Sequence, residues 1–437
     1  MLDNYAIDQY RNWFNDNYYR ITYGLSIEPD FSVHRRAARL ITAILIPPLT
    51  SIGAIYLIQA AAADPSRHLA ELRMLRWEAA LILCISLLWV FLHLRFLPGR
   101  RYDGPVCGNG LRPSYKRNGF AFYILTSTIV GTVTWVCGKS AFSLLPGLSF
   151  TAVVLGIFAA LAAYCKACLA PDPSQSSAPS NLVSDVFHGL ELYPRVGELH
   201  VKQALIRLGA TLNLWVLWSC FFAYLRPNLV GSVIIGLQFL HAARRFWNEE
   251  CYSQSIEVSY YKFGLREVLR HLVLKPFLLN LGTISSVHRP ASCRPSLLIL
   301  ISLIAILSIL LVYLIDRQKF LVKSKKGKCM TWGRMARTIN AFYVDEHGLR
   351  RASILLFSGF WGLARHLNYT FEFIVYCVLA GPALTSSNWF SAIPPGLILV
   401  SLLHRGKEDF DKCRRKYGPY WKMYCDKVPY GYIPWLW

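Results

Sequence analysis

The chain is poor in charged side chains. Only 16% of its 437 residues are Asp, Glu, Lys or Arg, whereas 54% are hydrophobic. A soluble globular domain averages about 25% charged residues. This shortage excludes an ordinary soluble domain and favours a protein that buries much of its surface in lipid.

The common motifs of soluble nucleotide-binding and hydrolytic enzymes are also missing. The nearest match to G-x-G-x-x-G is Gly108-Asn109-Gly110, which lacks the third glycine and the strand-to-helix context. No Walker loop, H-E-x-x-H or G-x-S-x-G is present. A soluble Rossmann domain is therefore excluded.

Cysteine is present but does not form a metal-binding pattern. Most of the 12 cysteines lie inside apolar runs, where a free thiol behaves as a small hydrophobic group. Cys165 and Cys168 form a lone C-x-x-C without a second pair or a His pair at zinc spacing. We interpret this pair as a helix end, with S-acylation as the alternative, and predict no metal site.

Long apolar runs recur along the chain. Several approach the roughly 20 residues that cross a bilayer as a helix. The longer runs are residues 40–60, 79–96, 120–137, 149–164, 205–225, 229–243 and 297–315. Shorter apolar arms are residues 272–287, 354–363, 371–380 and 389–403. This pattern predicts an all-α polytopic membrane protein with about eight to ten transmembrane helices.

Two polar segments suggest how the chain is divided. Residues 1–36 are polar and aromatic, without the pattern of a secretory signal, and we expect a short cytosolic lead. Residues 170–181 are rich in Pro and Ser and are predicted to be a linker. The linker separates N-terminal transmembrane helices in residues 37–169 from a second membrane half that begins at residue 182.

Positive charge is concentrated in two stretches. The formal net charge is +22, and residues 317–351 contain ten Lys or Arg side chains. Residues 405–427 are similarly basic. The positive-inside rule predicts that both stretches face the cytosol. Nucleic acid is not an expected partner, because no binding module or aromatic platform accompanies the charge.

The two basic stretches constrain the segment between them. If both face the cytosol, the chain between them crosses the membrane an even number of times. We therefore expect a hairpin in residues 371–403 that turns at Gly381-Pro382. Its arms are only about 10 to 15 residues, which predicts partly re-entrant or protein-buried helices.

Several side chains near the basic stretches suit a phosphorylated aromatic ligand. Lys319 and Lys323 share one helical face and could hold a phosphate. The other candidates are Trp361 for stacking, Asn368 and Asp409 for hydrogen bonds to an amide or ribose, and Tyr417 and Tyr424 on one helical face. The alternative is a set of snorkelling cations and an interfacial aromatic belt.

Two signatures resemble the sterol reductase family, which includes Δ7-, Δ14- and Δ24(28)-sterol reductases. The C-terminal signature is matched by Leu402, Leu403, His404, Arg405, Asp409, Cys413, Lys416, Tyr417 and Gly418, with Glu408 in place of an Arg. The other signature is matched by Asp185, Phe187, Gly189, Leu192, Pro194 and Arg195, with Tyr193 in place of an Asn. The resemblance spans about residues 104–437 and is strongest to the 7-dehydrocholesterol (Δ7-sterol) reductase branch.

The resemblance implies an NADPH site in a C-terminal membrane region, residues 317–437. The matching positions are Lys319, Lys323, Leu356, Trp361, Asn368, Tyr369, Asp409, Cys413, Arg414, Arg415, Lys416, Tyr417 and Tyr424. Lys323 stands where the Δ7 branch has Arg, so the charge is kept but the bidentate geometry is lost.

The substrate-side helices, residues 182–316, depart further from the family pattern. Aromatic and polar family residues within 260–289 are replaced by Tyr261, Leu265, Leu269, Leu274, Leu279 and Gly282. Arg244 replaces a family Asp. Such changes can alter the shape of an apolar pocket while the cofactor site persists.

The resemblance implies an NADPH-dependent reductase of a sterol C=C bond in sterol biosynthesis. We expect a multi-pass protein of the endoplasmic reticulum membrane, with the cofactor site facing the cytosol and a sterol or sterol-like substrate. It could also associate with other sterol-biosynthesis enzymes. Glu249 is the candidate proton relay, which His366 and Tyr369 could join, because a buried carboxyl can stay neutral near pH 7. The alternative role for Glu249 is a helix–helix hydrogen bond.

Three alternatives remain open from the sequence. One is a Δ14-sterol reductase, and another is a diverged paralogue that reduces a non-sterol terpenoid, which the changes in residues 260–289 favour. A third, from a different class, is a sterol-binding membrane scaffold without catalysis. A scaffold is expected to lose cofactor residues, whereas this chain keeps them.

Overall fold

The computed structural model describes most of the chain. The described residues are 53–62, 76–104, 112–171, 179, 181–223, 228–344, 348 and 350–436. The predicted cytosolic lead, most of the linker and the Gly108-Asn109-Gly110 segment lie outside these ranges. Of the first apolar run, residues 53–60 are described and belong to a helix, Gly53–Ala62.

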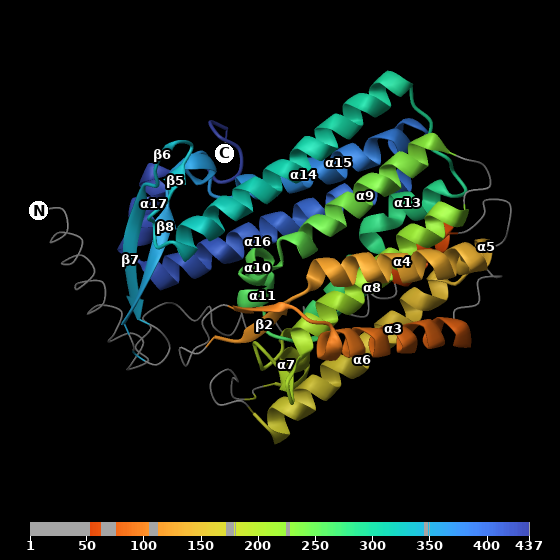
Figure 1. The fold of residues 1–437 in the computed structure, drawn as a ribbon, viewed down its shortest axis with the longest axis horizontal. Helices are drawn as coiled ribbons and strands as arrows, with labels where there is room; N and C mark the ends of the chain where they lie inside the picture. Colours follow the sequence, from red (N-terminus) through yellow and green to blue (C-terminus); the bar gives the residue numbers. More distant parts are fainter. Residues whose placement is uncertain are drawn as a thin grey trace, which may run out of the picture. The chain divides into compact units, whose positions relative to one another are not determined.

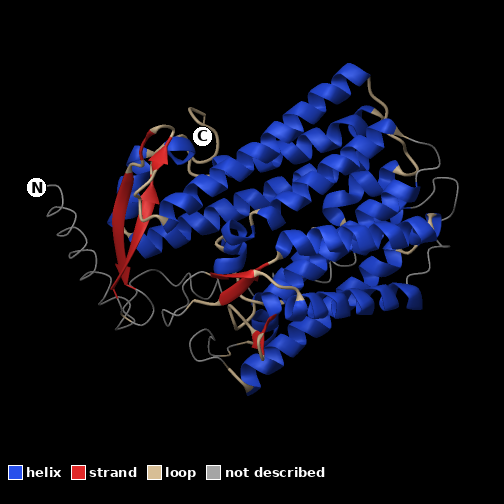
Figure 2. Cartoon of the chain, viewed as in Figure 1, coloured by secondary structure: helices blue, strands red, loops and turns tan. Residues whose placement is uncertain are grey.

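Helices dominate the described residues, as predicted for a polytopic membrane protein (Figure 2). Six of them are long and apolar enough to cross a bilayer: α3 (Trp77–Phe96), α4 (Gly119–Cys137), α6 (Leu145–Leu169), α8 (Val201–Ala223), α14 (Pro295–Ser324) and α15 (Leu367–Thr385). Two more helices are of similar length, α9 (Leu229–Trp247) and α16 (Ile393–Tyr417). The multi-pass fold is thus confirmed, while the number of spans stays a prediction.

The remaining elements are short. The helices are α5 (Lys139–Ser143), α7 (Leu182–His188), α10 (Glu249–Ser253), α11 (Ile256–Ser259), α12 (Leu265–Leu269), α13 (Leu281–Ser286) and α17 (Pro419–Lys427). The π- and 3-10 segments are η2 (Arg270–Leu274), η3 (Leu278–Asn280), η4 (Gly359–Gly362) and η5 (Trp389–Ala392). The strands are β1 (Arg100–Asp103), β2 (Ser114–Arg117), β3 (Arg195–Val196), β4 (Leu199–His200), β5 (Met330–Thr331), β6 (Arg334–Met335), β7 (Thr338–Val344) and β8 (Arg350–Leu356), paired in four antiparallel hairpins.

The chain forms two compact units. The larger unit draws on Arg39–Ile309 and Phe373–Leu399, and the smaller unit on Leu310–Glu372 and Val400–Trp437. The boundaries between the units fall inside α14, α15 and α16.

Helix α8 is the central helix of the larger unit. It lies beside α3 and α4, and α3 lies beside α6 (Figure 1). Its side chains are buried on most of its circumference, including Leu212, Val216 and Leu217, which are fully buried. A helix that is apolar on all faces is stable only when neighbours cover it. The close approach of α4 uses Gly131, where an added Cβ would lie 3.0 Å from the Trp218 ring.

The predicted apolar arm at residues 272–287 is not one continuous helix. The chain there passes through η2, η3 and α13. Pro276 lacks a backbone N–H, so it interrupts the regular hydrogen-bond ladder. The Asn280 backbone N–H donates a hydrogen bond to the Phe277 carbonyl, and its side chain donates one of 2.8 Å to the Pro276 carbonyl.

The smaller unit combines the ends of long helices with β-structure. In the β7–β8 hairpin, Ile339 is paired with Leu355, and Ala341 is fully buried in a cluster with residues of α16 and α17. The alternation of buried and exposed residues in β7 is typical of a sheet with one covered face. The prediction of an apolar arm at residues 354–363 was wrong, because this stretch ends β8 and forms η4.

The predicted turn at Gly381-Pro382 was also wrong. Helix α15 continues through Pro382 to Thr385, and the chain turns at residues 386–388, where Ser387 has φ of 58°. The Pro382 carbonyl accepts a hydrogen bond of 2.8 Å from the Thr385 hydroxyl. A side-chain donor thus satisfies a carbonyl of the last helical turn, beyond which α15 ends. The arms are not short: α15 has 19 residues and α16 has 25, because each continues past its apolar part into the polar residues beside it.

Candidate functional site

The larger unit contains a cavity that encloses about 1170 Å³ of non-atom space, part of it open to solvent. Helices α8 and α9 supply more of the lining residues than any other elements. Others come from β1, β2, α4, α10, α11, η2, η3 and α15. Its wall combines aromatic and ionisable groups, including Tyr102, Tyr123, Lys202, Arg207, His241, Phe246, Glu249, Tyr252, His271, Lys275 and Tyr376.

A buried ion pair forms one wall of this cavity. The Glu249 carboxylate contacts the Arg207 guanidinium and accepts a hydrogen bond of 2.8 Å from the Gly119 N–H. The Arg207 side chain is only 1% exposed and lies over the rings of Phe122 and Phe246, at 5.1 and 5.3 Å. Glu249 thereby joins α4, α8 and α10. The contacts are those of the helix–helix alternative, and the role of Glu249 as proton relay stays a prediction.

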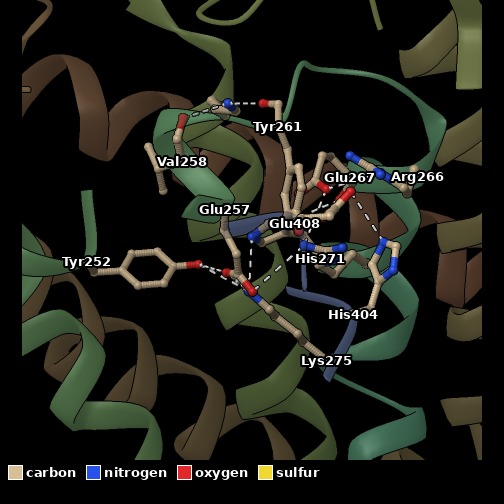
Figure 3. A network of polar contacts seen from close by, with 12 residues as sticks. Tyr252, Glu257, Val258, Tyr261, Arg266, Glu267, His271, Lys275, His404 and Glu408 are labelled. Atoms are coloured by element: carbon tan, nitrogen blue, oxygen red, sulfur yellow. Dashed lines mark hydrogen bonds and ion pairs between the residues drawn. The ribbon is translucent and has the colours of Figure 1, made fainter. Parts of the chain in front are cut away.

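A second polar network faces the same cavity (Figure 3). Lys275 Nζ lies 2.8 Å from Glu257 Oε2, 3.1 Å from the Tyr252 hydroxyl and 3.2 Å from His271 Nε2. His271 Nδ1 lies 3.0 Å from the Glu267 carbonyl oxygen, and a carbonyl oxygen can only accept a hydrogen bond. Nδ1 therefore carries the proton, and Nε2 accepts a hydrogen bond from Lys275. The Tyr252 hydroxyl donates to Glu257 over 2.7 Å. This network holds a phenol and an ammonium group at the cavity wall.

Neither Arg207 nor this network was predicted from the sequence. Arg207 could have been noticed as a lone cation inside the apolar run 205–225. Tyr252, Glu257 and Lys275 follow no helical or strand period, because they lie on short segments that include α10 and α11. Only the folded chain brings them together.

In the smaller unit, Lys319 and Trp361 form the centre of the predicted cofactor residues. Lys319 Nζ lies 4.0 Å from the centroid of the Trp361 ring, and Trp361 Nε1 donates to the Ile315 carbonyl over 2.9 Å. Trp361 is thus fixed in orientation, with a cation over one face. Lys323 lies one turn further along α14 and is exposed.

Asn368 has an unsatisfied side chain in this region. Its Nδ2 donates to Asp316 Oδ1 over 2.9 Å, and since a carboxylate only accepts, the amide orientation is determined. Asn368 Oδ1 is then buried without a hydrogen-bond partner among the described residues. An orphaned buried acceptor costs about 1–3 kcal/mol. A carboxamide or hydroxyl donor of a bound ligand would satisfy it, so Asn368 fits the predicted nicotinamide dinucleotide.

Helix α16 adds Asp409, Cys413 and Lys416 on one face. Burial raises the pKa of the Cys413 thiol to about 12; the Asp409 charge acts in the same direction and the Lys319 charge opposes it. Lys319 of α14 and Asp409 of α16 thus both act electrostatically on this thiol. Lys416 Nζ lies 4.0 Å from the centroid of the Tyr343 ring.

The other predicted cofactor residues fall into two groups. Leu356, Tyr417 and Tyr424 are buried in the cores of the smaller unit, where the Tyr424 hydroxyl contacts the Trp361 carbonyl oxygen at 3.5 Å. Arg414 and Arg415 are exposed. Leu356 packs in the same cluster as Trp361, and the two arginines add positive charge at the surface.

His366 and Tyr369 stack on each other in the smaller unit, with ring centroids 5.0 Å apart. Burial lowers the pKa of His366 to about 4, and the Lys319 charge acts in the same direction while Asp409 opposes it. His366 is therefore a neutral imidazole near pH 7. The three predicted catalytic residues do not share a unit, since Glu249 belongs to the larger one.

The comparisons relate most of the chain to one protein family. The Ergosterol biosynthesis ERG4/ERG24 family matches residues 48–437. Among curated relatives, a 7-dehydrocholesterol reductase of Arabidopsis thaliana is 32% identical over 83% of this chain and 85% of its own length. One of Xenopus laevis is 27% identical over 83% and 79%. The chicken (Gallus gallus) Delta(14)-sterol reductase LBR is 25% identical over 82% of this chain and 56% of its own length.

The chain belongs to the Ergosterol biosynthesis ERG4/ERG24 family, a family of sterol reductases. It is a multi-pass membrane oxidoreductase that acts on sterol C=C bonds, in a family that generally uses a nicotinamide cofactor.

Proposed function

We propose that this protein is an NADPH-dependent Δ7-sterol reductase of the endoplasmic reticulum membrane. The observation that supports the cofactor most directly is the unsatisfied Asn368 Oδ1 beside the Lys319–Trp361 pair. The relatives named 7-dehydrocholesterol reductase support the position of the double bond.

The smaller unit would hold the cofactor by polar contacts. Asn368 Oδ1 would accept a hydrogen bond from the nicotinamide carboxamide or from a ribose hydroxyl of the cofactor. The Asp409 carboxylate would accept a hydrogen bond from another hydroxyl of the cofactor. Lys319 and Lys323 would neutralise phosphate groups as point charges. When bound, NADPH supplies a hydride to the reaction.

The larger unit would hold the sterol in its cavity and supply the proton. A steroid ring system suits a wall that is largely aromatic and aliphatic, with few polar groups to fix its orientation. Reduction of a C=C bond needs a proton on one alkene carbon and a hydride on the other. Glu249 lines the cavity as the proposed relay, and Tyr252 lies in the same wall with a hydroxyl proton.

The cofactor assignment predicts a preference for NADPH. Replacing both Lys319 and Lys323 with Glu places negative charge where a ribose phosphate is proposed to bind. We expect the KM for NADPH to rise at least about tenfold, and the KM for NADH to change little, because NADH lacks that phosphate. Steady-state kinetics in microsomes measure both constants. Equal use of the two cofactors by the unmodified protein contradicts the assignment.

The proposed orientation predicts the sidedness of the C-terminus. Basic residues in 317–351 and 405–427 favour the cytosolic face. A glycosylation acceptor added after Trp437 is therefore expected to stay unmodified, as judged by the electrophoretic mobility of the expressed protein with and without glycosidase. Modification at that site contradicts a cytosolic cofactor site.

Sterol profiling tests the reaction itself. We would express the chain in yeast that accumulates ergosterol and its precursors, and identify the sterols by mass spectrometry. A Δ7-reductase converts 5,7-dienes into 5-enes. If the chain instead rescues a strain blocked in Δ14 reduction and leaves the 5,7-dienes unchanged, the result favours a Δ14-sterol reductase, as the chicken relative is named. An unchanged sterol profile in both strains contradicts a sterol reductase of either kind.

A further inference from the structure

A second cavity lies in the larger unit and encloses about 500 Å³ of non-atom space. Small and aliphatic side chains dominate its wall, among them Gly231, Ile234, Gly282, Ala380, Ala383 and Pro394. Four residues, Gln238, Leu279, Tyr376 and Leu379, line both this cavity and the larger one. The two cavities therefore share a wall.

Helix α9 runs along both cavities. Gly231, Ile234 and Gln238 line the second cavity, and Gln238, His241 and Arg245 line the first. These positions are three, four, three and four residues apart, which places them on one face of the helix. From Gly231 to Arg245 this face extends for about 21 Å. An elongated ligand could lie along α9 and reach from one cavity into the other.

The two cavities differ in chemistry. Residues of ion pairs, such as Arg207 and Glu249, line the first cavity. In the wall of the second cavity, polar groups pair with each other instead, since Gln238 Nε2 donates a hydrogen bond of 2.8 Å to Thr283 Oγ1. One polar atom of the second cavity is unsatisfied, because the hydroxyl of Ser391, a residue that is 1% exposed, has no partner among the described residues. Most of the wall of the second cavity is small and aliphatic, which suits an apolar ligand.

We infer that the second cavity holds the aliphatic tail of the substrate whose ring system occupies the first cavity. This inference rests on the proposed sterol reductase function and names the part of the sterol that sets its specificity. Leu279 and Gly282 lie in the stretch 260–289, where the chain departs from the family pattern. Two of the six replaced positions in that stretch thus line the second cavity, the proposed tail pocket, where they affect which tails fit.

Two glycines of α9 provide a matched test. Gly231 lines the tail pocket, so Gly231→Leu fills it with four carbons. Gly236 is on the same helix and exposed, and an added Cβ there meets nothing within 4 Å. Leu is a better helix former than Gly, so neither substitution weakens α9. Gly236→Leu is therefore the control.

The probes are two 5,7-diene steroids with the same rings, one with a full aliphatic tail and one without it. Each buried pair of methylene groups changes affinity by about tenfold. We expect Gly231→Leu to raise the KM for the tailed steroid at least about tenfold and to leave that for the tail-less steroid nearly unchanged. Gly236→Leu should match the unmodified protein with both steroids.

Equal effects of Gly231→Leu on both steroids, or no effect on either, would overturn the inference. If the unmodified protein reduces neither steroid, the proposed function fails, but binding still tests the tail pocket. In that case the shift in thermal unfolding temperature caused by each steroid is measured on the same purified variants. The tailed steroid should then stabilise the unmodified protein more than the tail-less one, and Gly231→Leu should abolish the difference. If that difference is absent from the unmodified protein or persists in Gly231→Leu, the inference is wrong.

Discussion

Replacing Asp409 with Ala is expected to remove most of the reductase activity without unfolding the protein. Asp409 is half-buried on α16, and its charge acts on Cys413, His366 and Tyr424. We propose that it accepts a hydrogen bond from the bound cofactor. Losing a positioned polar contact in a catalytic site costs about 2–4 kcal/mol of transition-state stabilisation. That corresponds to a loss of roughly 30- to 1000-fold in kcat/KM.

Asp411 is the matched control for this prediction. It lies two residues further along α16, so it points to the other side of the helix, and it is exposed. Asp411→Ala is expected to leave kcat/KM nearly unchanged. Activities are compared in microsomes at matched expression, and thermal unfolding checks that both variants fold. Normal turnover in Asp409→Ala means that the α16 residues are only a solvated basic segment.

The second large effect is expected on stability, from Glu249→Gln. This substitution removes the charge that pairs with Arg207, whose side chain is 1% exposed. Removing one partner of a buried ion pair leaves the other charge uncompensated and costs about 3–5 kcal/mol. The unfolding temperature of the purified protein in detergent should therefore fall markedly.

Glu198→Gln is the control, because it removes the same charge from an exposed pair. Glu198 lies 2.6 Å from Arg95, and the two side chains are 86% and 59% exposed. An exposed pair contributes at most about 1 kcal/mol. Similar small shifts for both substitutions would contradict a structural role for the buried pair.

A double substitution separates stability from catalysis. Arg207→Met combined with Glu249→Gln removes both buried charges, and a neutral replacement of a buried pair often restores stability. A stable double variant that retains activity excludes Glu249 as the proton relay. A stable variant that loses activity while still binding the sterol supports that role.

The helical membrane fold could be predicted because its signal is local. An uninterrupted apolar run such as 297–315 is visible in the sequence, and α14 contains it whole. The turn at Gly381-Pro382 was misplaced because proline usually ends a helix, whereas α15 continues through Pro382 and ends at Thr385. The β7–β8 hairpin was missed because the alternation of Ile339 and Ala341 lies within a basic stretch interpreted only by its charge.

The candidate site was only partly predictable. Residues of the smaller unit such as Lys319, Trp361 and Asn368 were identified by their side-chain chemistry and by their resemblance to family positions. The structure adds the unsatisfied Asn368 oxygen. The polar contacts of the larger unit join distant parts of the chain: Arg207 is 42 residues from Glu249. No spacing in the sequence encodes such a contact, because it depends on how the helices pack.

Isotope transfer tests the central claim most directly. The purified protein would be incubated with a 5,7-diene sterol and NADPH that carries deuterium at the transferable position of the nicotinamide, in ordinary water. The account predicts a 5-ene product with a single deuterium on a former alkene carbon, and a second isotope only when the reaction is run in heavy water. A product without deuterium from NADPH, or the absence of any product, contradicts the account.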